Sequence, residues 1–177
     1  MVIRKNLIPK FALISVFDKI DLKKLCINLK KHNYKFISTG STFKKIKSLG
    51  FDCTEVSKIT KFEEMLEGRV KTLNPKIFGS ILYKRDNEKH IKEFENLKVP
   101  SISLVIVNLY PFKKYSKEKE KDKAIEMIDI GGPSLIRAAA KNFKFITTIC
   151  NTKYYYQLIN NLNKNNGDTD ITFRKSM

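Results

Sequence analysis

The chain of 177 residues has no tryptophan, only seven glycines and five prolines, and no long apolar run. Its longest apolar stretches, residues 11–17 and 104–107, fall far short of the roughly 20 residues that a membrane-spanning helix needs. The first residues also lack the small-residue cleavage pattern of a secretory signal. These absences exclude collagen-like and low-complexity chains, and they predict neither secretion nor a membrane partner.

Cysteine is scarce as well. Cys26, Cys53 and Cys150 are scattered and odd in number, which is typical neither of a disulfide framework nor of a zinc knuckle. We therefore expect a cytoplasmic location.

Acidic residues are outnumbered. The 18 Asp and Glu stand against 35 Lys and Arg, which gives a formal net charge of +17. Such a charge is typical of proteins that bind nucleic acid, but only five of the basic residues are arginine, the residue that reads phosphates and base edges with its planar fork. We expect a solvated basic surface that attracts small phosphorylated molecules, with no nucleic acid as a partner.

Short apolar runs alternate with segments of helical spacing. Residues 11–16, 35–38, 52–56, 103–109 and 145–150 are typical of short strands. Helices are expected from an N-cap at Asp18 to residue 33, at residues 43–49, 77–82 and 154–162, and over a segment that residues 128–133 open and residues 135–141 continue. This alternation predicts an α/β three-layer sandwich with a mainly parallel sheet flanked by helices. The whole chain, 1–177, is expected to be one domain, with 163–177 as a frayed tail.

In such sheets, ligands bind beyond the carboxyl ends of the strands. The turn from Thr39 to Thr42 groups hydroxyls around Gly40 at an expected helix start. Backbone N–H groups and the helix dipole favour a phosphate there. The turn lacks the GK[ST] ending of a P-loop, so nucleotide triphosphate hydrolysis is not indicated. An ordinary hydroxyl-capped helix would have the same sequence, and both interpretations stay open.

Two further turns carry charged side chains. Arg69 and Lys71 are two residues apart and would project the same way from an extended segment, although two solvated cations would fit the sequence equally well. Asp129 precedes a Gly-Gly helix start, and Lys141 ends that helix. The sequence would be the same if Asp129 were only a helix cap and Lys141 only a lysine on the helix surface. Together the turns predict a pocket for a phosphorylated small molecule, with lysine and aspartate for proton transfer.

Several strings point to one family. They are ALISVFDK, STGST, FEEMLEGRVKTLNPKIFGSIL, VNLYPF and IDIGGPSLIRAAAKN. In content and order they resemble the inosine monophosphate cyclohydrolase domain of the bifunctional purine-biosynthesis protein, over residues 11–150. The resemblance implies a methylglyoxal-synthase-like fold, and a homodimer is expected.

The implied reaction converts 5-formamido-1-(5-phosphoribosyl)imidazole-4-carboxamide into inosine monophosphate with loss of water, and also runs in reverse. No metal or cofactor is implied. The formyltransferase activity of the family is not expected in this chain, which ends at Met177 before the transformylase domain.

The resemblance also implies roles for single residues. Lys141 resembles the proton donor and acceptor, Asp129 its acid–base partner, Lys71 the group that stabilises the oxyanion, and Tyr110 a hydrogen-bonding group at the base. We expect Lys71 and Lys141 to converge on one pocket. The implied substrate-binding residues are Ser15, Asp18, Lys19, Thr39, Gly40, Ser41, Thr42, Arg69, Val70, Thr72, Val107, Asn108, Ile130 and Gly131.

Four positions depart from the family pattern. Phe17 stands where a hydroxyl is usual, Ser41 where a glycine is usual, and Asn74 and Phe143 where histidines are usual. None is an expected catalytic residue, so we expect effects on rate and affinity.

Two other functions stay open: a methylglyoxal-synthase-like lyase, and a regulatory nucleotide-binding module. The lyase would need a histidine at the phosphate site, but His32 and His90 lie outside every motif.

Overall fold

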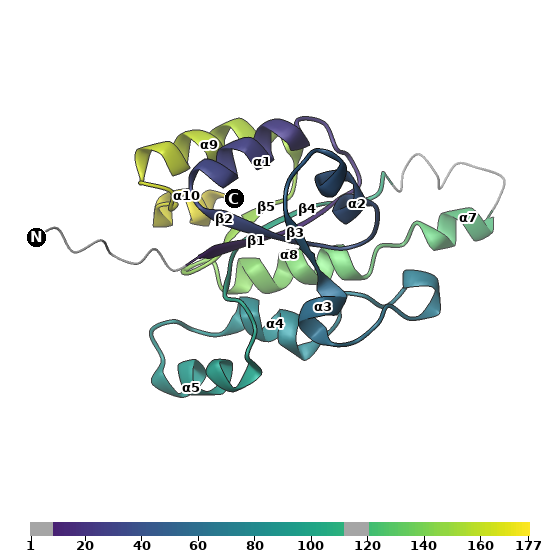
Figure 1. Ribbon diagram of the computed structural model, residues 1–177, viewed down its shortest axis with the longest axis horizontal. Coiled ribbons are helices and arrows are strands. Elements are labelled where there is room, and N and C mark those ends of the chain that lie inside the picture. Colours follow the sequence, from purple (N-terminus) through teal and green to yellow (C-terminus); the bar gives the residue numbers. More distant parts are fainter. Residues whose placement is uncertain (1–8, 112–120) are drawn as a thin grey trace, which may run out of the picture.

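The structure, a computed structural model, describes residues 9–111 and 121–177 (Figure 1). The sequence at residues 113–123 predicts a charged loop, and most of it lies outside the described residues. Five strands form one sheet in the order β3-β2-β1-β4-β5, and every pairing between them is parallel. The expected parallel sheet is confirmed. The strands are β1 (Lys10–Val16), β2 (Tyr34–Ser38), β3 (Cys53–Glu55), β4 (Ile102–Asn108) and β5 (Thr147–Ile149).

Helices cover both faces of the sheet, so the expected three layers are confirmed (Figure 1). Successive residues of a strand point to opposite faces. Ala12 and Ile14 of β1 accordingly pack with one buried cluster, while Leu13 packs with the other. The first face carries α1 (Leu22–Lys31), α9 (Tyr155–Lys164) and α10 (Ile171–Ser176). The second carries α4 (Pro75–Leu82), α5 (Glu88–Leu97) and α8 (Gly131–Lys141).

Two more helices begin at the carboxyl ends of strands: α2 (Gly40–Ser48) packs Ile46 into the first cluster, and α3 (Val56–Thr60) packs Val56 into the second. The remaining elements are a short 3-10 helix η1 (Leu66–Gly68), α7 (Lys121–Glu126), and a second 3-10 turn, η2 (Thr152–Tyr154), which precedes α9. Within the described residues, no helix has the length and apolar character that a membrane crossing requires.

The expected N-cap at Asp18 is wrong. Helix α1 begins at Leu22, directly after Asp21, which has a left-handed backbone with φ 56°. The Asp18 carboxylate instead accepts a hydrogen bond from the backbone N–H of Ile20 at 2.9 Å. A short side chain of this kind can close a local turn as readily as it can cap a helix.

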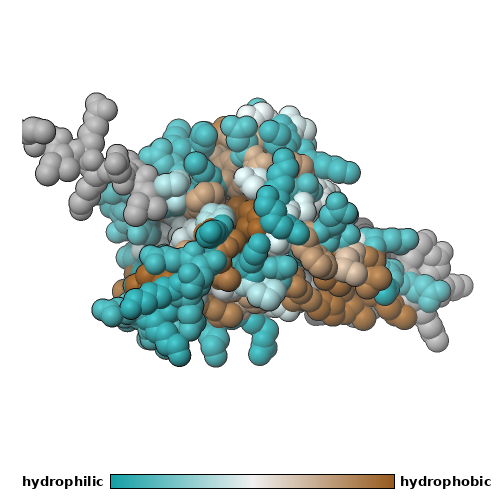
Figure 2. All heavy atoms as spheres, turned by 60° about the horizontal axis from the view of Figure 1, so that its bottom comes forward, coloured by the Kyte–Doolittle hydropathy of each residue, from teal (hydrophilic) through white to brown (hydrophobic). Residues whose placement is uncertain are grey.

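Helix α5 was not predicted, because its sequence looks like a solvated run. Its charged side chains lie on the side that Figure 2 brings forward. Asn87 caps the helix by accepting from the N–H of His90 at 3.1 Å. Phe94 stacks on Tyr83 with ring centroids 4.0 Å apart, and this aromatic pair attaches the helix to the end of α4.

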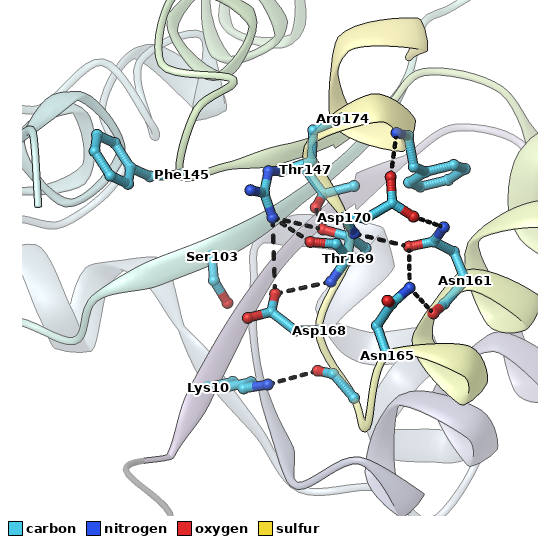
Figure 3. A network of polar contacts seen from close by, with 12 residues as sticks. Lys10, Ser103, Phe145, Thr147, Asn161, Asn165, Asp168, Thr169, Asp170 and Arg174 are labelled. Atoms are coloured by element: carbon cyan, nitrogen blue, oxygen red, sulfur yellow. Dashed lines mark hydrogen bonds and ion pairs between the residues drawn. The ribbon is translucent and has the colours of Figure 1, made fainter.

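Residues 163–177 are ordered in the structure, so the expected frayed tail is wrong. Helix α10 begins after Asp170, whose carboxylate accepts from the N–H of Phe173 at 2.7 Å and from the side-chain amide of Asn161 at 2.6 Å (Figure 3). The hydroxyls of Thr147 and Thr169 meet at 2.6 Å in a buried contact. The polar residues whose composition predicts a frayed tail therefore form hydrogen bonds with one another and with β5.

Candidate functional site

A cavity of about 690 Å³ opens at the carboxyl ends of β1, β2 and β4. This is the edge at which parallel sheets bind ligands. Its wall is formed by the turn after β1, the start of α2, the loop that contains η1, the end of β4, the end of α7 and the start of α8. Figure 1 shows where these segments lie in the chain. Distant parts of the sequence thus meet around one space.

Most of the predicted site residues line this cavity. They are Ser15, Lys19, Thr39, Gly40, Ser41, Thr42, Arg69, Lys71, Thr72, Asn108, Tyr110, Asp129, Ile130 and Gly131. Asp18, Val70, Val107 and Lys141 are not among the lining residues. Val107 is 1% exposed within the core, and Val70 pairs with Met65 in an isolated bridge.

Lys141 does not line this cavity in its own chain. Gly131, at the start of α8, lines the cavity, and Lys141 ends that eleven-residue helix. A rise of 1.5 Å per residue places their backbones about 15 Å apart. Lys141 is exposed there, so within one chain it does not converge with Lys71.

The hydroxyl cluster divides into two parts. Thr42 is 3% exposed, and its hydroxyl donates to the carbonyl of Val16 at 2.9 Å and accepts from the N–H of Val16 at 3.1 Å. This side chain ties the start of α2 to β1. Ser41 is exposed and Thr39 is partly exposed, and both line the cavity. The start of α2, with Gly40 in a left-handed conformation (φ 55°), thus combines hydroxyls with a helix N-terminus, which suits an anion.

Lys71 lies between two glycines. Its Nζ is 3.2 Å from an oxygen of Glu64, and its side chain is 28% exposed. A Cβ on Gly68, which has φ 88°, would lie 2.5 Å from that Nζ, and a Cβ on Gly40 would lie 3.3 Å from it. The ammonium therefore passes close to bare backbone on two sides.

Asp129 both lines the cavity and caps a helix. Its Oδ1 accepts from the backbone N–H of Gly132 at 2.7 Å, in the first turn of α8. A Cβ on Gly132 would lie 2.4 Å from the other carboxylate oxygen, so only glycine allows this approach. Asp129 can therefore serve both as a helix cap and as a carboxylate for proton transfer, the two interpretations that its sequence allowed.

The mouth of the cavity carries an ion pair that the sequence did not reveal. Arg69 and Glu126, the last residue of α7, form a salt bridge, and both side chains are exposed. The hydrogen bond between them raises the pKa of Arg69 and lowers the pKa of Glu126. The cation expected to grip phosphate is therefore already paired with a carboxylate.

The turn after β1 is held by the side chains of two predicted site residues. Asn108 donates to the carbonyl of Asp18 and accepts from its N–H, both at 2.9 Å. The ammonium of Lys19 donates to the carbonyls of Val16 and Phe17 at 3.2 and 3.1 Å. These side chains shape the cavity wall as well as lining it.

The four departures have different surroundings. Phe17 and Ser41 line the cavity, and the ring of Phe17 lies 5.1 Å from that of Tyr110. Asn74 caps α4 by accepting from the N–H of Lys76 at 2.9 Å. Phe143 is not among the lining residues. In the described parts of the chain, no cluster of three or more His, Cys, Asp or Glu is arranged to hold a metal ion.

Comparisons with known proteins give a consistent result. Residues 21–134 match the family model described as the MGS-like domain. The bifunctional purine biosynthesis protein PurH of Clostridium botulinum (strain Loch Maree / Type A3) is 47% identical over 169 residues, which are 95% of this chain and 34% of that protein. PurH of Clostridioides difficile (strain 630) is 49% identical over 154 residues, or 86% of this chain and 30% of that protein.

Among solved structures, the crystal structure of ForH superposes with a TM-score of 0.80 and 25% sequence identity, covering 94% of this chain and 86% of that one. This similarity agrees with the fold described above. The chain spans about a third of the length of the curated relatives that it matches.

Proposed function

Because the chain belongs to the family of MGS-like domains, we propose that its cavity closes the purine ring of a phosphorylated ribonucleotide. The substrate is 5-formamido-1-(5-phosphoribosyl)imidazole-4-carboxamide, and the product is inosine monophosphate. One observation carries the proposal. A helix N-terminus, three cationic side chains (Lys19, Arg69 and Lys71) and the Asp129 carboxylate line one cavity, in a chain 47% identical to PurH over 169 residues.

The phosphate of the substrate is proposed to bind at the start of α2. Its backbone N–H groups and the exposed Ser41 provide hydrogen-bond donors there, and the helix dipole favours negative charge. Arg69 stands at the mouth and is suited to a bidentate grip on phosphate. It has to leave Glu126, or share its donors, when the substrate arrives.

Ring closure needs two proton transfers at neighbouring atoms. The carboxamide nitrogen attacks the formyl carbon, a C–N bond forms, and negative charge develops on the formyl oxygen. We assign the ammonium of Lys71 to stabilise this oxygen and to give it a proton, and the carboxylate of Asp129 to take a proton from the attacking nitrogen. The hydroxyl then leaves as water while the formamido nitrogen loses its proton, and the C=N bond of the ring forms.

The structure supports the roles that the resemblance implies for Tyr110 and Lys141 to different degrees. Tyr110 lines the cavity and is proposed to hydrogen-bond the base. The role of Lys141 in proton transfer stays a prediction from the resemblance alone, because this side chain is exposed and is not among the residues that line the cavity of its own chain.

A homodimer and a cytoplasmic location also stay proposals. Exposed apolar side chains surround the mouth of the cavity, and an apolar region is visible on that side of the molecule in Figure 2. They include Met65, Leu66, Ile125, Ile128 and Ile130, each 47–65% exposed. Contiguous apolar surface of this kind is typical of contact with another protein surface.

The decisive experiment assays the purified chain with the formamido substrate and follows formation of inosine monophosphate by absorbance. We expect turnover in the wild type and a loss of at least about 100-fold in Lys71→Ala, the range for removal of an oxyanion donor. Binding of inosine monophosphate without turnover would instead indicate a nucleotide-binding module. Release of phosphate from a triose phosphate would indicate the lyase.

A further inference from the structure

We propose that Glu64 is a positioning residue that holds the ammonium of Lys71 in place for the reaction. Its catalytic consequence rests on the proposed function. The contact on which it stands is the 3.2 Å approach of a Glu64 oxygen to the Lys71 Nζ. Glu64 was not singled out from the sequence, since only the path of the loop brings it to Lys71.

Glu64 approaches Lys71 from outside the reaction cavity. A second cavity of about 310 Å³ adjoins the first, and Lys71 and Thr39 line both of them. Glu64 lines only the second. The ammonium thus lies in the partition between two spaces, with the carboxylate on one side and the proposed substrate on the other.

This placement gives the pair complementary tasks. A lysine ammonium has three N–H donors, so one can be held by Glu64 while others face the reaction cavity. The carboxylate does not line the cavity that would receive an anionic substrate, so it orients the cation without competing for that space. A group that is oriented before the substrate binds stabilises developing charge at a smaller cost than a mobile one.

The glycines on either side make an external anchor necessary. Lysine has a flexible four-carbon stem, and Gly68 and Gly40 present only backbone to its tip. No side chain at these two positions can restrict where the amine points. A charged partner at the tip, which Glu64 provides, supplies the missing constraint.

Glu63 offers a matched control. It is the neighbouring residue, lines the same second cavity and carries the same charge. Within the described residues it forms no ion pair with Lys71. Glu63→Gln therefore removes a charge from the same cavity without removing the anchor.

The first test compares the ring-closure kinetics of Glu64→Gln, Glu64→Asp and Glu63→Gln. We expect Glu64→Gln to lower kcat about ten-fold with KM within about two-fold of the wild type, since the interaction of Lys71 acts on the transition state. Glu64→Asp should restore kcat to within about three-fold, and Glu63→Gln should stay within about two-fold. Equal kcat in Glu64→Gln and Glu63→Gln overturns the proposal.

The second test needs no substrate and therefore separates this proposal from the proposed function. Acetylation of Lys71 by acetic anhydride is timed by peptide mass spectrometry in all variants. An amine held by a carboxylate reacts slowly, so Glu64→Gln should be labelled at least about three-fold faster than the wild type, and Glu63→Gln at the wild-type rate. Equal labelling overturns the positioning role even if the wild type closes the ring. If faster labelling is found in a protein that closes no ring, only the proposed function fails.

Discussion

The guanidinium of Arg69 is paired with the carboxylate of Glu126 at the mouth of the cavity. The loop after η1 and the end of α7 are joined by this contact, although they are 57 residues apart in the sequence. The carboxylate occupies the kind of position that a substrate phosphate would take. Under the proposed function, a substrate phosphate that binds Arg69 would replace the Glu126 carboxylate.

Glu126→Gln should strengthen binding of inosine monophosphate by about two- to five-fold, because an exposed ion pair is weak and its loss leaves Arg69 available. Isothermal titration calorimetry measures the change. Glu95→Gln on α5 removes a charge elsewhere and should have no effect. Weaker binding in Glu126→Gln would mean that the pair supports the site instead of competing with the ligand.

Gly68→Ala and Gly50→Ala should differ in ring-closure activity, but the strain in the backbone should lower the free energy of unfolding equally in both. Both glycines have left-handed backbones, with φ 88° and 85°, but a Cβ on Gly50 meets no atom within 4 Å, whereas one on Gly68 meets Lys71. Each change should lower the free energy of unfolding by about 1 kcal/mol. Only Gly68→Ala should also lower kcat, by about ten-fold or more. Chemical denaturation and the ring-closure assay measure the two effects, and equal activity in the two variants would contradict the assignment of Lys71.

Thr42→Val should lower the free energy of unfolding by about 1–3 kcal/mol, because it removes the buried hydroxyl that accepts from the N–H of Val16 and leaves the Val16 carbonyl only the Lys19 ammonium as a side-chain donor. Ser41→Ala, at an exposed position, should change stability by less than about 0.5 kcal/mol. It should weaken binding of inosine monophosphate by about three- to ten-fold, as loss of one hydrogen bond predicts. Urea unfolding measures the effect of each change on stability, and calorimetry measures its effect on binding. A larger loss of stability in Ser41→Ala than in Thr42→Val would contradict these assignments.

Alkaline pH should destabilise the fold through buried groups. Burial raises the pKa of Cys26, Cys53 and Tyr34, each to about 12, from ordinary values of 9.0 for the thiols and 10.0 for the phenol. These groups ionise first in the unfolded chain, so the unfolded state binds fewer protons and the free energy of unfolding falls as pH rises from about 9 to about 12.

Urea unfolding at pH 8, 9, 10 and 11 measures this slope. Cys26→Ala should be less stable at pH 8, because it leaves a small cavity in the core. Its stability should then fall less steeply above pH 9, because one ionising thiol is gone. An identical slope in the two proteins would remove Cys26 as a contributor.

The sheet could be predicted because its strands are buried on both faces. Runs such as residues 11–16 and 103–109 are apolar almost throughout, and only a central strand of a layered sheet needs that pattern. The rule that ligands bind at the carboxyl edge then directed attention to the correct turns. The positions of Thr39, Arg69 and Asp129 around one cavity followed from this rule.

The partners of the site residues could not be predicted in the same way. Glu64 and Glu126 reach Lys71 and Arg69 only because of the path of the loop around η1, where Leu66 and Glu67 have left-handed backbones. Non-glycine residues rarely adopt this conformation, and nothing in their sequence indicates it. The tail was misjudged because polar residues such as Asn161 and Asp170 bond to each other, which composition does not show.

Backbone on two sides of the Lys71 amine has a mechanical consequence. A Cβ on Gly40 or Gly68 would lie 3.3 or 2.5 Å from the Lys71 Nζ, so the main chain at both glycines runs close to the amine. A shift of the main chain at either glycine displaces it directly. A movement of the chain at this edge of the sheet would therefore change the position of the Lys71 ammonium relative to the reacting atoms.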